Sequence, residues 1–471
     1  MSRFTSIRWL TMVTSMIGLA GCTVHPPGER EERDTALQAG KPFEKRMEDR
    51  NIPPLPENPT PDQILQYALL SNAELEQHYW EWRSAIEQVP QDGTQTTTLN
   101  IAAGASITNG RTSWGSSTVA LSNDPMTDIK WPAKLDAAAK QTLENAKAAG
   151  QRFIRAKYDL RTKVLNAYYD YTLNAELIRL EQSNRQLLRT TATVTRSRNR
   201  AGSSGQQDVL KANNEVDLSD NEIASMQSQL PTQRAAINAL LSRPADAPLP
   251  VPAELPPARP LAYGDGELIE LAAKQNPELI ALADEIRARG EGIRLAKLQY
   301  VPDFNLSAGT DLMGVTQSLL GQATIPLLRF EALNAAIAQA QANLRASEAM
   351  RRQAGNDLAA QVVADITIIR DADRQLDFFA HEILPRAGEI VNVGRSAYET
   401  GHASLLDLLE NQRSLIAIER LVADLRITRE KRLVELESIT ASDLSSPGHS
   451  DAHVGAEAGN RPGASLPEKL N

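Results

Sequence analysis

The chain has 471 residues, a formal net charge of −9 at pH 7 and only 4% aromatic residues. Its length suffices for two domains of ordinary size with a substantial core. The acidic balance, with no basic block after the N-terminal segment, argues against a nucleic-acid partner. No run of about 18 apolar residues follows that segment, so we expect no membrane-spanning helix in the mature chain.

Residues 1–21 have the features of a secretory signal peptide, because two arginines precede a short apolar run that ends in small residues. The sequence Leu19-Ala20-Gly21-Cys22 resembles the bacterial lipobox, in which the cysteine is lipidated and becomes the first residue. Cys22 is the only cysteine, so the alternative is a structural thiol without a disulfide partner. We expect a covalent lipid on Cys22 and no other cofactor. Lipoproteins of this kind often carry an aspartate next when they stay in the inner membrane, so Thr23 favours the outer membrane.

Residues 22–60 are polar and contain seven prolines, which predicts an extended tether. The first structural repeat is expected over residues 61–242. Its predicted elements are a helix at about 61–88, a β-hairpin at 97–122 with period-two alternation, a helix at about 132–198, a tight turn, and a helix to about 241. The long helix would measure about 100 Å at 1.5 Å per residue, and its Leu173, Leu177 and Leu180 follow coiled-coil spacing.

The second half repeats this order. A proline-rich linker over residues 243–262 leads to a second repeat over residues 263–439. Its predicted elements are a helix at about 266–300, two short strands, a long helix opened by Pro326, a tight turn, and a helix at about 405–439. The predicted seam of this long helix includes Val362, Ile366 and Ile369. Residues 440–471 have no periodicity and are expected to form a disordered tail.

Two tight turns share the template Gly-x5-Asp-x-Leu. One runs from Gly202 to Leu210 and the other from Gly401 to Leu409. The glycines are expected to adopt the left-handed conformation that ends a helix, and Ser203, Ser204 and Ser404 are candidate caps for the helices that follow. The turns lie 199 positions apart, and the pair Asn72-Ala-Glu-Leu75 and Asn276-Pro-Glu-Leu279 repeats with a similar offset. The chain is therefore interpreted as a duplicated unit.

The predicted strands require an assembly. Four strands with one apolar face do not close into a membrane barrel, and open strand edges are not viable in lipid. Small membrane barrels need about eight strands or more, so two, three or four chains would be required. The alternative is a soluble hairpin cap over the helices.

The complete order of elements resembles the TolC-like outer-membrane efflux proteins, and within them the lipoprotein branch. This resemblance covers roughly residues 60–440 and rests on the lipobox, the two hairpins, the two long helices and the twin turns. It implies a mainly α fold with a small β part: a long α-helical coiled-coil barrel plus a transmembrane β-barrel completed by trimerisation. It also implies a homotrimer in contact with outer-membrane lipid, a periplasmic adaptor (membrane fusion) protein and an inner-membrane pump.

The same resemblance implies roles for the residues around the turns. Family members carry acidic residues after the second turn that project into the pore, and Asp407 and Glu410 match them. Tyr398 and Asp208 match a pair that restrains the closed tip through a hydrogen bond, whereas Ala403 occupies the place of a second restraining arginine. The alternative for both aspartates is stabilisation of a helix N-terminus. The residues expected to form the tip turns and to meet the adaptor, unless they serve only the turns, are Gly202, Ser203, Ser204, Gly401 and Ala403.

An enzyme is not expected. The six histidines show no metal-ligand spacing, and no phosphate-binding loop or nucleophile elbow is present in the sequence. The competing interpretation is a lipid-anchored periplasmic coiled-coil scaffold or spacer without a pore. A scaffold would not need the alternating strands. The cargo is not encoded in any recognisable pattern, because the pump selects substrate upstream in such systems.

Overall fold

The computed structural model describes residues 23–95, 98–108, 111–122, 130–252, 254–311, 317–324 and 329–444. The predicted signal peptide, Cys22, the two strand-connecting turns, Pro326 and most of the predicted disordered tail lie outside these ranges. Within the described part of the chain, no helix combines the length and apolar character needed to cross a membrane.

The chain divides into two compact units, each built from three segments. Unit 1 consists of Met1–Lys41, His78–Phe153 and Glu278–Ala354, whereas unit 2 consists of Pro42–Gln77, Ile154–Pro277 and Gly355–Asn471. Each unit takes segments from both sequence repeats. The two are described separately below.

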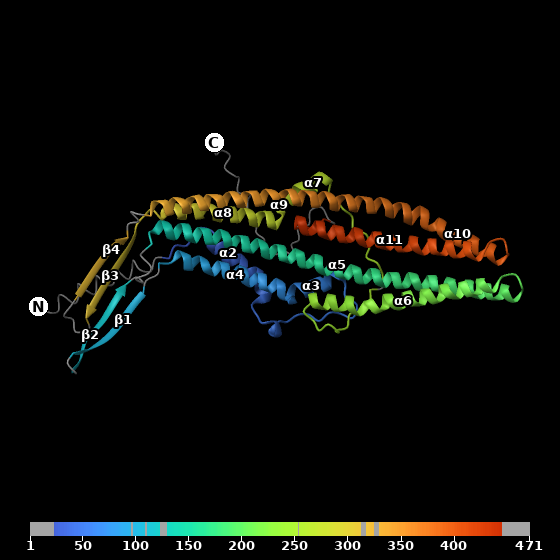
Figure 1. Ribbon diagram of the computed structural model, residues 1–471, viewed down its shortest axis with the longest axis horizontal. Coiled ribbons are helices and arrows are strands. Elements are labelled where there is room, and N and C mark those ends of the chain that lie inside the picture. The colour runs from blue at the N-terminus through green and yellow to red at the C-terminus, as the bar shows by residue number, and fades with distance from the viewer. Residues whose placement is uncertain are drawn as a thin grey trace. The chain divides into compact units, whose positions relative to one another are not determined.

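Unit 1 contains one antiparallel sheet made from both predicted hairpins (Figure 1). The strand order is β1-β2-β3-β4, with β2 paired to β3, so the hairpins of the two repeats join directly. A register shift between Gly104 and Ser106 interrupts the β1–β2 ladder, which is the signature of a bulge. β1 and β4 form the two edges. The strands are β1 (Thr98–Thr108), β2 (Arg111–Ser122), β3 (Asp303–Asp311) and β4 (Gln317–Thr324).

The segment expected to be an extended tether folds in part. Helix α2 (Glu29–Ala39) packs in unit 1, where the buried carboxylate of Glu32 accepts a hydrogen bond of 3.0 Å from the Trp82 indole on α4 (Ala73–Gly93). A Cβ at Gly150 would lie 2.8 Å from that indole. Gly150 therefore permits a close approach of the indole to α5 (Pro132–Arg200), which continues through this glycine without interruption.

The first long helix is confirmed as α5 (Pro132–Arg200), which spans 69 residues. The second is interrupted. Helix α9 (Phe330–Phe378) passes into a π-helical turn (Phe379–Ile383) before α10 (Leu384–Glu399). Pro385 explains the turn, because proline has no N–H to donate and its ring clashes with the carbonyl four residues earlier. The helices that follow the two tight turns are α6 (Gln206–Leu240) and α11 (Leu405–Thr440).

Each helix that opens a repeat also breaks, and it breaks at the equivalent asparagine. Asn72 ends α3 (Pro61–Ser71) and Asn276 ends α7 (Asp265–Gln275), after which α8 (Pro277–Leu298) begins. Within unit 2, the Asn72 amide donates to the Leu240 carbonyl at 2.9 Å and the Asn276 amide donates to the Ile439 carbonyl at 3.0 Å. The repeated Asn-x-Glu-Leu motif thus ties each opening helix to the end of the last helix of its own repeat. This shared role supports the duplication.

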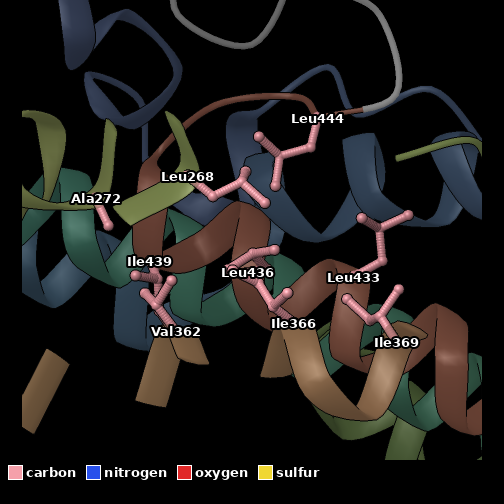
Figure 2. Close-up of a cluster of buried hydrophobic side chains, with 9 residues drawn as sticks. All are labelled: Leu268, Ala272, Val362, Ile366, Ile369, Leu433, Leu436, Ile439 and Leu444. Carbon is pink, nitrogen blue, oxygen red and sulfur yellow. The ribbon is translucent and has the colours of Figure 1, made fainter. Parts of the chain in front are cut away.

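The main apolar cluster of unit 2 confirms one predicted seam. Val362, Ile366 and Ile369 of α9 are buried together with residues of α7 and α11 (Figure 2). The seam predicted on α5 is different, since Leu173, Leu177 and Leu180 are only half-buried. The neighbouring Asn174 and Ile178 are the buried residues there. The heptad pattern therefore located the apolar side of α5 approximately. The positions that are buried within the chain are shifted by one residue from the predicted seam.

The proline-rich linker is extended, as expected, but it is held to unit 2 by an ionic network. The Arg259 guanidinium donates to Glu430 and to Glu437 of α11, both at 2.9 Å. Both carboxylates are fully buried. Arg161 of α5 pairs with Glu437 at 2.8 Å, and Arg429 pairs with Glu430 at 2.6 Å. The linker is therefore an internal strap that neutralises buried charge.

Candidate gate at the helical tips

The two Gly-x5-Asp turns lie at the same end of unit 2 and have the same backbone geometry (Figure 1). Gly202 has φ +74° and Gly401 has φ +86°, which confirms the predicted left-handed conformation. In the first turn the Ser203 N–H donates to the Arg198 carbonyl at 2.8 Å, and in the second the His402 N–H donates to the Ala397 carbonyl at 2.8 Å. Both helices thus end in a Schellman motif with identical offsets.

The caps of the following helices differ between the two turns. Ser404 forms a capping box, in which its hydroxyl accepts from the Asp407 N–H at 3.2 Å while the Asp407 carboxylate accepts from the Ser404 N–H at 3.1 Å. The first turn has Gly205 at this position and no side-chain cap. Ser203 and Ser204, which were candidate caps, do not serve as such. The Ser204 hydroxyl instead donates to the Thr195 carbonyl at 3.3 Å.

Asp407 is exposed and its carboxylate faces the start of its own helix. Hydrogen bonds from the Ser404 hydroxyl and backbone lower the pKa of Asp407 below its ordinary value. Glu410 is exposed one turn further along α11. Asp208 is half-buried, and among the described residues its carboxylate has no hydrogen-bond partner. The capping role expected for Asp407 as an alternative is therefore present, and it leaves the exposed side of the carboxylate accessible.

Tyr398 connects the two turns, but not through the expected partner. Its side chain is 2% exposed, and its hydroxyl donates to the Thr195 hydroxyl at 2.8 Å. A phenol has one proton to donate, so this bond replaces the predicted one to Asp208 within the chain. The hydrogen bond links the helix that ends at the second turn to the helix that precedes Gly202, rather than to the helix that follows Gly202.

Arg198 is the residue that the sequence did not reveal. Its guanidinium lies over the Tyr398 ring, 4.6 Å from the centroid, and donates to the Tyr398 carbonyl. Arg198 lies four residues before Gly202, and the equivalent residue of the second turn is Ala397. Comparing the two turns would have shown this difference, which was the only signal for Arg198 in the sequence. Ala403, where the family pattern has an arginine, instead packs against the apolar cluster that includes Leu405 and Leu408. A second polar link joins α5 to α11, since the Gln412 amide donates to the Thr191 hydroxyl at 3.0 Å.

A groove lies beside the second turn, between α10 and α11. Ile390 and Val393 are exposed in it. A Cβ at Gly394 would approach the Asn411 amide to 2.9 Å, so this glycine allows the two helices to lie close together. The residues lining the groove are Arg386, Glu389, Ile390, Val393, Gly394 and Asn411. No cluster of three or more His, Cys, Asp or Glu side chains with metal-binding geometry occurs in the described ranges.

Comparison with known proteins finds a family match within the second repeat. Residues 268–442 match the outer membrane efflux protein family model. The fusaric acid resistance protein FusA of Burkholderia cepacia is 26% identical over 188 residues, which are 38% of this chain and 34% of FusA. The cobalt-zinc-cadmium resistance protein CzcC of Cupriavidus metallidurans is 23% identical over 290 residues, which are 59% of this chain and 66% of CzcC. The chain thus spans about a third of the first relative and just under two thirds of the second.

Solved structures share the fold. A membrane protein from Pseudomonas aeruginosa superposes with a TM-score of 0.70 at 19% identity, covering 81% of this chain and 90% of that one. The outer membrane protein VceC of Vibrio cholerae superposes with a TM-score of 0.69 at 17% identity, covering 82% of this chain and 96% of VceC. Residues 268–442 therefore match the outer membrane efflux protein family model, and the chain shares the mainly helical fold of these solved structures.

Proposed function

We propose that this chain is the outer-membrane exit duct of a tripartite efflux or export system. It would pass substrates from an inner-membrane pump and a periplasmic adaptor to the outside. The observation that carries the proposal is the match of residues 268–442 to the outer membrane efflux protein family, on a chain with the fold of such channels. No catalytic role is proposed.

The pore would be built by three copies. Among the residues that the structure describes, the sheet of one chain has four strands, and β1 and β4 each have one unpaired edge. Three chains supply twelve strands, which suffices for a closed barrel in which no edge remains. The half-buried leucine seam of α5 is consistent with this assembly, because it offers apolar surface to a neighbouring chain.

A lipid on Cys22 would attach the chain to the outer membrane. The next residue, Thr23, pairs with Thr94 in an antiparallel bridge, and Val24 donates to the Gly93 carbonyl at 2.9 Å. Thr94 lies four residues before β1. This pairing supports the anchor, since it holds the N-terminal segment next to the start of a strand that would enter the membrane. Mass spectrometry of the mature chain tests the acylation, and an unmodified Cys22 thiol would contradict it.

The twin turns would form the periplasmic gate. Asp407 and Glu410 are proposed to face the pore and to attract cations, because a ring of like charges in a narrow aqueous constriction concentrates counter-ions. Tyr398 would hold the closed state together with Arg198 and Thr195. Asp208, whose expected bond is taken by Thr195, is proposed to contribute charge at the same constriction.

The adaptor and the pump are inferred partners. The small residues Gly202, Ser203, Ser204, Gly401 and Ala403 and the groove between α10 and α11 offer a surface to a helical partner. Two classes of cargo are candidates, namely organic compounds and metal ions. The relatives' names mention fusaric acid in one case and cobalt, zinc and cadmium in the other.

Reconstitution of the purified full chain in planar bilayers tests the proposal. We expect discrete single-channel conductance from preparations in which crosslinking demonstrates a trimer. A verified trimer without conductance would overturn the duct and favour the lipid-anchored scaffold.

A further inference from the structure

Both long helices begin with a basic residue followed by an aromatic residue. Lys130-Trp131 precedes α5, and Arg329-Phe330 opens α9. The Trp131 side chain is 45% exposed and the Phe330 side chain is 52% exposed. Single exposed apolar residues need no explanation, but large aromatics at the equivalent place in both repeats of a duplicated chain indicate a common requirement.

The two pairs are linked at one end of unit 1, where the helices meet the strands (Figure 1). Asp303, the first residue of β3, accepts from the Trp131 N–H at 3.3 Å and from the Lys134 ammonium at 2.7 Å. Three residues earlier, Tyr300 stacks on Phe330 with ring centroids 6.1 Å apart. The Tyr300 hydroxyl donates to Asn334 at 2.9 Å. The segment 300–303 therefore holds both aromatic positions in one local arrangement.

Among the residues that the structure describes, the charge around these aromatics is mainly positive. Lys130, Lys297 and Arg329 are exposed, and among the described residues none of them forms an ion pair. The carboxylate of Asp303 is already engaged by Lys134. Glu331 is the one exposed carboxylate that directly follows these pairs. Three available cations beside three aromatic rings form a surface suited to phosphate groups at the edge of an apolar phase.

We propose that these residues form a collar that binds the phosphate headgroups of anionic phospholipids where the sheet enters the membrane. The collar is defined as Lys130, Trp131, Lys297, Tyr300, Arg329 and Phe330. Interfacial aromatics place their rings at headgroup depth, and lysine and arginine pair with lipid phosphate there. The occupant is a bilayer surface, because the collar lies at the helix–strand junctions and Thr23, next to Cys22, is bridged to another such junction at Thr94. This inference rests on the proposed function and adds the lipid class that the membrane boundary prefers.

Spin labelling of the full chain in vesicles tests the position of the collar. A nitroxide is placed on Phe330→Cys or, as a control, on Met350→Cys, an exposed position about 30 Å further along α9. Unsubstituted protein labelled in parallel reports any free thiol at Cys22. We expect the label at 330 to be shielded from a water-soluble relaxing agent and the label at 350 to be accessible. Equal accessibility at both positions would overturn the inference.

Lipid selectivity tests the charges. The association of spin-labelled phosphatidylglycerol, relative to phosphatidylcholine, is measured for the parent, for Lys130→Gln with Arg329→Gln, and for Lys130→Arg with Arg329→Lys. We expect the preference for phosphatidylglycerol to fall by up to about fivefold for each cation removed and to persist in the charge-conserving variant. An unchanged preference in the glutamine variant would overturn the inference. Conductance of the same preparations separates the exit-duct proposal from the collar proposal. Protein that conducts while its collar stays accessible to water contradicts the collar alone. Protein that neither inserts nor conducts contradicts both proposals.

Discussion

The guanidinium of Arg198 lies over the aromatic ring of Tyr398, 4.6 Å from its centroid, and so joins the ends of two helices that are 200 residues apart in sequence. The contact combines a cation–π interaction, worth about 0.5–2 kcal/mol, with a charged hydrogen bond to a backbone carbonyl, worth about 1.5–3 kcal/mol. It lies between the two Schellman turns. If the turns form a gate, this contact opposes their separation.

We expect Arg198→Gln to open the channel more often. The variant loses the cation–π contact and the charge on the hydrogen bond, so the closed state becomes less stable. Arg196→Gln is the matched control, since Arg196 is on the same turn of α5 and donates to the nearby Asn213 of α6 at 3.2 Å rather than to the second turn. Open probability in planar bilayers is the measurement. An equal change of open probability in both variants would mean that the loss of surface charge, and not the loss of the Arg198–Tyr398 contact, is responsible.

The bond between Tyr398 and Thr195 should show energetic coupling. Tyr398→Phe retains the buried ring and removes one hydrogen bond, at a cost of about 0.5–1.5 kcal/mol in the free energy of unfolding. Thr195→Val removes the partner. A double-mutant cycle, measured by thermal denaturation, is expected to give a coupling energy of about 1 kcal/mol. Strict additivity would contradict a direct bond and would return Asp208 to consideration as the partner of Tyr398.

The capping and pore roles of Asp407 can be separated. Ser404→Ala should weaken the start of α11 by about 0.5–2 kcal/mol and leave ion selectivity unchanged. Asp407→Asn should reduce cation selectivity measured from reversal potentials in a salt gradient. Since the folded pKa of Asp407 is lowered, its contribution to stability is present above the unfolded pKa and is lost as the pH falls through the folded value. Identical selectivity in Asp407→Asn and the parent would show that this carboxylate does not face the pore.

The sequence was most informative where one physical rule acts alone. Period-two strands, long amphipathic helices and glycines that end helices follow from local patterns, and they are found at the predicted places. The hydrogen-bond partner of a side chain is harder to predict from the sequence. The Tyr398 hydroxyl had hydroxyl and carboxylate groups as candidate partners, and the packing of α5 against α10 selects Thr195. The α5 seam failed for a similar reason: a helix with apolar residues on adjacent faces does not specify which face its own chain will cover. The helix breaks at the two asparagines were not predicted, because the carbonyls to which their side-chain amides donate lie more than 160 residues away in the sequence.

Arg259 should be essential for holding the proline-rich strap. In Arg259→Met the two buried carboxylates lose their shared cation but keep Arg161 and Arg429, so we expect a destabilisation below the about 3–5 kcal/mol that an unpaired buried charge costs. We expect faster amide hydrogen exchange in residues 243–262 as well as a lower melting temperature. Arg243→Met is the control within the same linker, where the guanidinium bonds to the Pro248 carbonyl at the surface. Unaltered exchange in Arg259→Met would mean that proline stiffness alone positions the strap.

Asp365 should make unit 2 more stable at mildly acidic pH. Burial, reinforced by the nearby charge of Glu435, raises the pKa of Asp365 to about 6, although Arg432 lies 3.5 Å away and opposes the shift. The folded state therefore binds a proton more tightly than the unfolded state does. The contribution is full below the unfolded pKa of about 4 and is lost as the pH rises through about 6. The asparagine in Asp365→Asn cannot ionise. The melting temperature of this variant minus that of the parent should therefore be larger at pH 7 than at pH 4, and it should increase as the pH rises from about 4 to about 7. Asp371→Asn, an exposed change on the same helix, serves as the control. A difference between Asp365→Asn and the parent that does not vary with pH would show that Asp365 ionises normally in the folded chain.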